Sequence, residues 1–273
     1  MLFNSYLFSF LFLPATVLLF HLLRRIGVAR GAIFSLVMAS FIFYGWWSFK
    51  YLFLLLGLMA VDFFIARQIL LWRASHRGHA KALVVTGLII NLAALGYYKY
   101  ANFFIDNVNA LFGLDLFLAT IVLPIGISFF TFQKVAFLVD LYQHKITKFN
   151  LLDYALFVTF FPQLIAGPIV HHSEVIPQFA RLGKVPISDI VLGITIFIIG
   201  LSKKVLLADN AALYVYPQIH AVFNGSHLDI LAAWINMQAY TAQIDFEFYA
   251  YSYIAIGIGI LIGKKFPVKL DYP

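Results

Sequence analysis

The residues best suited to proton transfer are two adjacent histidines, His171 and His172, which are followed by Glu174. Histidine titrates near neutral pH, so either ring could exchange protons at the mouth of a cavity. Neighbouring residues of a helix point about 100° apart, so the two rings cannot bind one metal ion from a single face. We therefore predict no metal site here. Two interpretations stay open: proton-transfer groups, or interfacial histidines that bond to backbone and water.

The segment that leads to these histidines is an apolar run interrupted by helix-breaking residues, FFPQLIAGPIVHHSEVIPQF at 160–179. Pro162 and Pro168 each remove a backbone donor and clash with the preceding turn, and Gly167 precedes the second proline. In lipid, backbone groups that are freed in this way have no water to bond to. The break must therefore face protein or a wet cavity inside the bilayer.

Further polar side chains lie within apolar stretches, where their cost in lipid predicts that they face a cavity or a partner group. Asp62 and Arg67 are five residues apart, slightly beyond the best helical pairing distance, and we expect a structural role for them. Asp245 and Glu247 are either carboxylates inside a membrane helix, where one could be protonated or bind a cation, or ordinary interface residues. The set comprises Asp62, Arg67, Gln133, Lys134, Asp140, Asp245 and Glu247.

Common catalytic motifs do not occur. The stretch GIGILIGKK at 257–265 lacks the G-x-G-x-x-G spacing and a preceding strand, so we interpret Gly259 and Gly263 as positions of close helix packing. There is no cysteine, which excludes disulfides, thiolate catalysis and thiolate metal sites. The net charge of +7 comes from short basic clusters between apolar spans, a distribution that indicates membrane topology and not nucleic-acid binding.

The composition is that of an integral membrane protein, with 63% hydrophobic and 11% charged residues among 273. We predict an all-α, polytopic bundle of about 8–10 spans that fills residues 1–273 as a single membrane domain. An interfacial helix is expected at 100–118. The predicted spans are 2–23, 31–47, 49–71, 82–98, 119–140, 153–170, 187–202, 229–246 and 248–263.

The basic clusters orient this bundle by the positive-inside rule. Clusters follow the first, third and fifth spans, and Lys203 and Lys204 follow the span 187–202. Placing all of them in the cytoplasm puts the N-terminus outside. The basic residues come after the first apolar run, so we expect an uncleaved first helix.

Six stretches, in this order, resemble the membrane-bound O-acyltransferase (MBOAT) family and its bacterial polysaccharide-acetylating branch, typified by alginate O-acetylation. The resemblance covers nearly the whole chain. The stretches are SFIFYGWWSFKYLFLL, YKYANFFIDNVNALFG, LPIGISFFTFQKVAFLVDLY, FFPQLIAGPIVHHSEVIPQF, GLSKKVLLADN and YSYIAIG.

The resemblance implies a multi-helix enzyme with a funnel through the bacterial inner membrane. An acyl thioester, acetyl-CoA or an acyl carrier, would donate from the cytoplasm to a hydroxyl of an exported polysaccharide such as alginate. No bound cofactor is implied. A catalytic histidine is expected in a tryptophan- and arginine-rich motif that lies downstream of YSYIAIG, beyond Pro273, so none of this chain's residues is assigned as catalytic.

We interpret the chain as the N-terminal part of such an enzyme, truncated and active when complemented by its other half. Whether the chain alone is an enzyme stays open. The family pattern is altered at Glu247, Ala250 and Tyr253, where aspartate, glycine and a second aspartate are usual. Two alternatives remain, a transporter-like protein and a non-catalytic scaffold for periplasmic acetylation partners. The residues expected along the substrate path are Gln133, Asp140, His171, His172 and Glu247.

Overall fold

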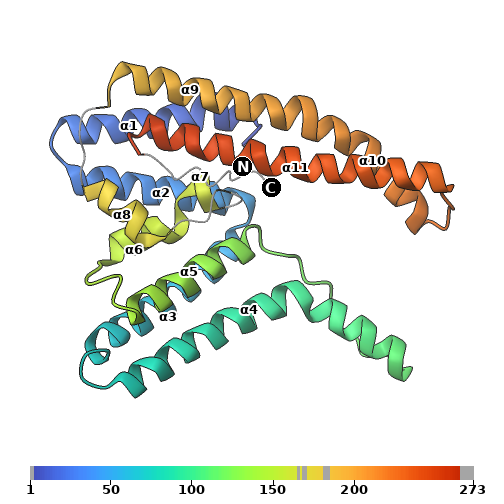
Figure 1. Cartoon of the computed structure of the whole chain (residues 1–273), viewed down its shortest axis with the longest axis horizontal. Helices are drawn as coiled ribbons and strands as arrows, with labels where there is room; N and C mark the ends of the chain where they lie inside the picture. Colours follow the sequence, from blue (N-terminus) through green and yellow to red (C-terminus); the bar gives the residue numbers. More distant parts are fainter. Residues whose placement is uncertain (1–2, 165–166, 168–170, 181–184, 265–273) are drawn as a thin grey trace. The chain divides into compact units, whose positions relative to one another are not determined.

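The computed structural model describes residues 3–164, 167, 171–180 and 185–264 (Figure 1). These residues form helices and no strands, which confirms the all-α prediction. They divide into two compact units, each with its own internal packing. We call residues 33–164 and 171–180 the α3–α5 unit, and residues 3–32 and 185–264 the α9–α11 unit, after the helices that dominate them.

In the α3–α5 unit, α3, α4 and α5 pack against one another, and the short α6 contacts α3, α5 and α8. A Trp47–Ser48 junction separates α2 from α3, and extended backbone at Ser48 starts the new helix. The helices are α2 (Ala29–Trp47, its first residues in the other unit), α3 (Phe49–Trp72), α4 (Arg77–Phe112), α5 (Ile127–Tyr142), α6 (Leu151–Thr159), α7 (Phe161–Leu164) and α8 (His172–Ala180).

In the α9–α11 unit, α9 runs along α11, and α10 also packs on α11. The close approach depends on glycine: a Cβ added at Gly193 would lie 2.9 Å from the carbonyl oxygen of Gly257. Asp229 caps α11 by accepting a hydrogen bond from the Ala232 N–H at 2.6 Å. The helices are η1 (Phe8–Phe12, π-helical), α1 (Leu13–Arg25), α9 (Ile187–Ser202), η2 (Lys203–Ala208, π-helical), α10 (Asp209–Phe223) and α11 (Ile230–Leu261).

Six helical segments of the described residues are long and apolar enough to cross a bilayer, so the chain is a polytopic helical membrane protein. α2 and α3 match two of the predicted spans closely. The six segments are Phe8–Arg25, Ala29–Trp47, Phe49–Trp72, Arg77–Phe112, Ile187–Phe223 and Ile230–Leu261.

Several predicted boundaries are wrong because helices continue through them. The spans 229–246 and 248–263 are one helix, α11. The span 82–98 and most of the interfacial helix 100–118 belong to α4, which ends at Phe112 and changes direction partway along its length (Figure 1). The span 187–202 continues through η2 into α10, which places Lys203 and Lys204 inside a helical run and not in a flanking loop.

The helix of the predicted span 119–140 begins at Ile127, and Gly126 precedes it with φ of +72°. In the predicted span 153–170 the helix breaks at Phe160, between α6 and α7. Pro162 lies in the first turn of α7, where its missing N–H costs little. The Phe161 N–H donates to Ser40 Oγ at 3.1 Å, and Phe160 and Phe161 are buried. The break therefore faces protein, as predicted; Pro168 lies outside the described residues.

Candidate functional site

The centre of the candidate site is Asp140, near the end of α5. Its carboxylate contacts two nitrogen groups, the imidazole of His171 and the ammonium of Lys145. Its Oδ2 lies 2.8 Å from His171 Nδ1 and its Oδ1 lies 3.1 Å from Lys145 Nζ. The Asp140 side chain is 4% exposed, whereas those of His171 and Lys145 are 45% and 54% exposed. The structure thus joins two of the predicted path residues, Asp140 and His171, across 31 positions of the sequence.

This geometry orients the His171 ring. When its carboxylate is ionised, Asp140 only accepts hydrogen bonds, so Nδ1 donates to it and, in the neutral ring, Nε2 is the proton acceptor. A carboxylate that fixes a histidine in this tautomer is the arrangement used to position a general base. Glu174 bonds to the backbone instead. Its carboxylate accepts from the His171 backbone N–H at 3.3 Å, which caps the start of α8.

The backbone around Asp140 is held by the way α5 ends. The Lys145 N–H donates to the Asp140 carbonyl at 3.0 Å and the His144 N–H to the Leu141 carbonyl at 3.2 Å, which together form a Schellman motif. His144 takes the left-handed position of this motif, with φ of +63°, where glycine is usual. The turn brings Lys145 back toward Asp140.

Arg73, at the end of α3, fixes the loop that follows. Its guanidinium donates to the carbonyl oxygens of Leu141, Ile146 and Thr147, the second at 2.7 Å. Arg73 is buried, and this burial lowers its pKa, although a guanidinium stays protonated at neutral pH. No ion pair among the described residues includes Arg73, and its guanidinium bonds to the three carbonyl oxygens.

The His172 ring contacts two phenylalanine rings. Its centroid is 5.1 Å from that of Phe137 and 5.4 Å from that of Phe157. It is 5% exposed, and its Nε2 has no hydrogen-bond partner among the described residues. Burial lowers the pKa of His172 to about 4, and the Asp140 charge offsets only part of that effect, so the ring is neutral at pH 7.

Gln133 lies on α5 seven residues before Asp140, a spacing that places both on one face of the helix. It is 3% exposed, and its side-chain oxygen has no hydrogen-bond partner among the described residues. The structure therefore places Gln133 in the interior of the α3–α5 unit, two turns along α5 from the Asp140–His171 pair.

A second buried cluster joins α3, α4 and α5. Asp62 Oδ2 lies 3.1 Å from Lys134 Nζ, and Asn91 Nδ2 donates to Asp62 Oδ1 at 2.7 Å. All three side chains are buried. Asp62 therefore connects helices, in line with the structural role expected for it. Its partner is Lys134 and not Arg67, which is exposed.

Glu247 belongs to the α9–α11 unit and is engaged there. Its Oε1 lies 2.7 Å from Lys204 Nζ, which also binds Asp209 at 2.7 Å, and Tyr251 donates to the same oxygen at 3.2 Å. Lys204 stands in η2, and π-helical turns often occur at functional positions. The Glu247 carboxylate is thus paired with an ammonium group in the middle of α11, which runs on to Leu261.

Sequence reasoning misses Arg73 and Asn91. Arg73 belongs to a basic cluster that, on sequence alone, indicates only topology. Asn91 is a lone amide within GLIINLAALG. A single polar residue in such an apolar run is the feature by which the sequence could have indicated it. Among the described residues, no three His, Asp or Glu side chains are grouped so that they could hold a metal ion.

The membrane-spanning helices, with a broken, buried segment and an acid–histidine pair, place this chain in the class of polytopic helical membrane proteins. Its family follows from comparison with known proteins. The sequence profile of the membrane-bound O-acyltransferase (MBOAT) family matches residues 87–271. The chain belongs to this family.

Relatives named for O-acetylation align along the entire chain. It is 37% identical to the peptidoglycan O-acetyltransferase of Helicobacter pylori, with 100% of this chain and 56% of that protein covered. It is 36% identical to the "Probable alginate O-acetylase AlgI" of Pseudomonas aeruginosa, with 100% and 52% covered. A teichoic acid D-alanyltransferase of Streptococcus thermophilus is 25% identical over 55% of this chain. The chain spans about half the length of the first two relatives.

Proposed function

We propose that this chain is the N-terminal part of a membrane O-acyltransferase that acetylates an exported polysaccharide at the bacterial inner membrane. The observation that carries this proposal is the similarity over the whole chain to proteins named for O-acetylation of peptidoglycan and of alginate. The acyl donor would be a thioester, acetyl-CoA or an acyl carrier, and the acceptor a sugar hydroxyl on alginate or a related polymer. Residues 1–273 would act as one membrane domain.

The reaction moves an acyl group from sulfur to oxygen. The hydroxyl oxygen attacks the thioester carbonyl carbon, the carbon–sulfur bond breaks, and the hydroxyl proton ends on the departing thiolate. A positioned base assists such a proton transfer by about 10²–10⁴-fold. We place His171, oriented by Asp140, on the path as a proton-transfer group, and Gln133 and His172 as residues that line it. Glu247, already bound to Lys204, would hold α11 in place.

A hybrid protein tests this function. Residues 1–273 are joined to the remaining C-terminal part of the P. aeruginosa relative and expressed in a strain that lacks its own alginate O-acetylase. Acetyl esters on the secreted polymer are then measured by NMR. We expect the hybrid to restore acetylation, and Asp140→Asn to lower it by at least tenfold.

Asp106→Asn is the matched control, because it makes the same change at an exposed carboxylate that forms no ion pair among the described residues. It should change acetylation by less than about twofold, as expected for a surface substitution away from the site. A stable hybrid that yields no ester while the intact P. aeruginosa protein does so would refute the proposal. Equal losses in the two variants would remove His171 from the path.

A second function, that of a scaffold for a periplasmic acetylation partner, is favoured by the segment after α4. Asn109 bonds to both the N–H and the carbonyl of Leu116, at 3.0 and 2.9 Å, and Asn102 accepts from the Ile121 N–H at 3.0 Å. This ordered segment presents Phe117, which is 91% exposed. Co-purification of a periplasmic protein that Phe117→Ser abolishes, without acetylation by the hybrid, would support this scaffold.

A further inference from the structure

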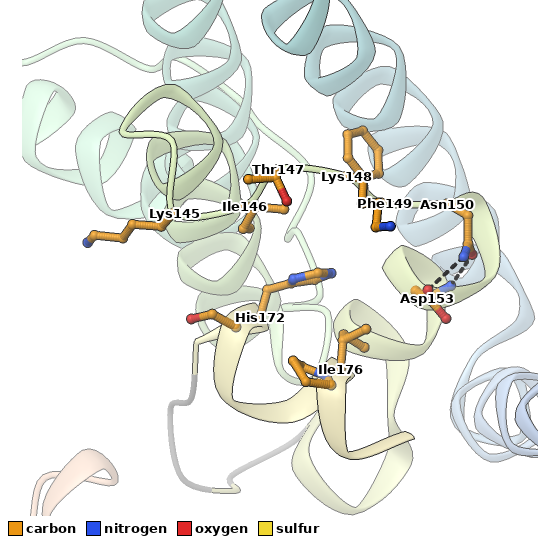
Figure 2. A pocket seen from close by; sticks show the side chains of 11 residues that line it. Lys145, Ile146, Thr147, Lys148, Phe149, Asn150, Asp153, His172 and Ile176 are labelled. Atoms are coloured by element: carbon orange, nitrogen blue, oxygen red, sulfur yellow. Dashed lines mark hydrogen bonds between the residues drawn. The ribbon is translucent and has the colours of Figure 1, made fainter. Parts of the chain in front are cut away.

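A cavity of about 490 Å³ lies between the loop 145–150 and the helices α6 and α8 (Figure 2). Its volume is within the range of about 300–1,000 Å³ that is usual for small-molecule sites. The cavity lies within the α3–α5 unit and does not include His171. Its lining residues are Lys145, Ile146, Thr147, Lys148, Phe149, Asn150, Asp153, His172, Ser173, Ile176 and Pro177.

One part of the lining offers donors to an anion. Lys145 and Lys148 contribute ammonium groups, and Thr147 and Ser173 contribute hydroxyls. Lys145 also forms an ion pair with Asp140. Lys148 is exposed, and none of the ion pairs among the described residues involves it. The lining also includes one carboxylate, Asp153, whose Oδ2 accepts a hydrogen bond at 2.6 Å from Nδ2 of Asn150, another lining residue.

Arg73 also fixes the orientation of the loop backbone. The carbonyls of Ile146 and Thr147 point toward its guanidinium. In a trans peptide the N–H points opposite to the carbonyl, so the N–H groups of Thr147 and Lys148 point away from Arg73. Arg73 does not line the cavity, whereas both of these residues do. The buried guanidinium also adds a positive charge behind the loop.

The remaining lining is apolar or neutral. Phe149, Ile176 and Pro177 contribute carbon surface, and the His172 imidazole stands in Figure 2 between the loop and α8. Burial keeps this ring uncharged at neutral pH. The cavity thus combines a basic rim with an uncharged wall.

From this arrangement we propose that the cavity binds a phosphate ester, with the phosphate held by Lys148, Lys145 and the loop donors and an uncharged arm packed on Phe149, His172 and Ile176. Two sources share this chemistry: a phosphorylated thiol carrier such as coenzyme A, and the headgroup of an anionic phospholipid. The proposal concerns binding and does not depend on acyl transfer.

Direct binding to the full chain in nanodiscs of a zwitterionic lipid tests the proposal. The probes are coenzyme A, followed by calorimetry, and phosphatidylglycerol introduced into the discs, followed by the rise in melting temperature. Lys148→Gln should weaken binding of at least one probe about tenfold, which corresponds to about 1.4 kcal/mol. Ser173→Trp, at an exposed position of the lining, should obstruct the cavity and weaken binding as strongly.

Lys81→Gln is the matched control, because Lys81 is an exposed lysine of another basic cluster and does not line the cavity. A loss for coenzyme A that spares this control supports a carrier ligand; a loss confined to phosphatidylglycerol supports a lipid ligand. If neither probe binds, or if Lys81→Gln weakens binding as much as Lys148→Gln, the site is overturned. Binding of coenzyme A by a hybrid that fails to acetylate polymer would sustain this site while refuting the proposed function.

Discussion

The two units of the molecule hold their helices together by different means. In the α3–α5 unit a buried carboxylate, an ammonium and an amide, Asp62, Lys134 and Asn91, connect three helices. In the α9–α11 unit, backbone contact takes this role: a Cβ at Gly200 would lie 2.8 Å from the backbone nitrogen of Ile254. Lipid supplies no hydrophobic drive between helices, so association must come from polar contacts or from close packing. The α3–α5 unit uses a buried polar cluster, whereas the α9–α11 unit combines close glycine packing with the partly exposed Lys204–Glu247 pair.

The largest effect is expected from removing one member of the buried pair. Asp62→Ala leaves the Lys134 ammonium buried without its counter-charge, and the loss of a partner of this kind costs about 3–5 kcal/mol. We expect the free energy of unfolding to fall by that amount when the chain is titrated with a denaturing detergent in mixed micelles. Replacing both residues, as Asp62→Leu with Lys134→Met, should recover most of the loss.

Glu247→Ala provides the contrast in the other unit. The Glu247 side chain is 32% exposed and Lys204 keeps its bond to Asp209, so the expected cost is about 0–1 kcal/mol. Equal losses for Glu247→Ala and Asp62→Ala would show that burial does not distinguish the two clusters.

A pH dependence of somewhat smaller size should come from His172. Its pKa is about 4 in the folded protein, against about 6.5 when unfolded, so the unfolded state binds more protons between these values. The free energy of unfolding is therefore highest above about pH 6.5 and falls as the pH is lowered, by about 3 kcal/mol near pH 4. Comparison of wild type and His172→Leu between pH 7.5 and 4.5 measures this contribution, and identical slopes would contradict it.

Glycine packing in the α9–α11 unit is tested by Gly200→Ala. The added methyl would press on the backbone of Ala250 and Ile254, and overpacking of this kind costs about 1–3 kcal/mol. Gly57→Ala in α3 is the control, since its Cβ would meet nothing within 4 Å, and it should stabilise by up to about 1 kcal/mol. Thermal unfolding in the same detergent compares the two, and a Gly200→Ala protein as stable as wild type would refute the packing role.

The smallest effect is expected at the end of α5. His144 has a φ of +63°, a conformation that costs a residue with a side chain about 1–2 kcal/mol and glycine almost nothing. His144→Gly should raise the free energy of unfolding by up to about 1 kcal/mol, because glycine also gains freedom in the unfolded state. It should keep the pH slope that His172 produces. A lower free energy of unfolding would show that the His144 side chain makes contacts that stabilise the protein by more than its backbone strain costs.

The fold class could be predicted from the sequence because lipid admits few alternatives to helices for long apolar segments. Element boundaries were less accessible. Glu247 and Lys204 each resemble the end of a span, but they neutralise one another across 43 positions, and both helices continue. Only the structure shows that pairing.

For the candidate site, the sequence indicates which residues matter but not which residues they contact. Asp140 and His171 stand out as polar residues in apolar surroundings, yet nothing local indicates that they meet. Spacing along the chain suggests Arg67 as the neighbour of Asp62, whereas Lys134 on another helix is its partner. Close helix packing is predicted at Gly259 and Gly263. Gly263 follows α11, with φ of +73°, and a Cβ there would lie 2.6 Å from Val185 Cγ2, whereas Gly257 makes the close contact with α9.

The bend in α4 has a consequence for how the protein responds to bilayer thickness. A straight helix of its 36 residues would be about 54 Å long, and a hydrocarbon core of about 30 Å would hold it only at a tilt beyond the usual range of about 0–40°. The change of direction relieves this hydrophobic mismatch, because the two parts of a bent helix need not cross the core at one common tilt. Thicker or thinner bilayers should therefore alter the surroundings of Tyr97 and Tyr100 while the buried contacts of Asn91 stay the same.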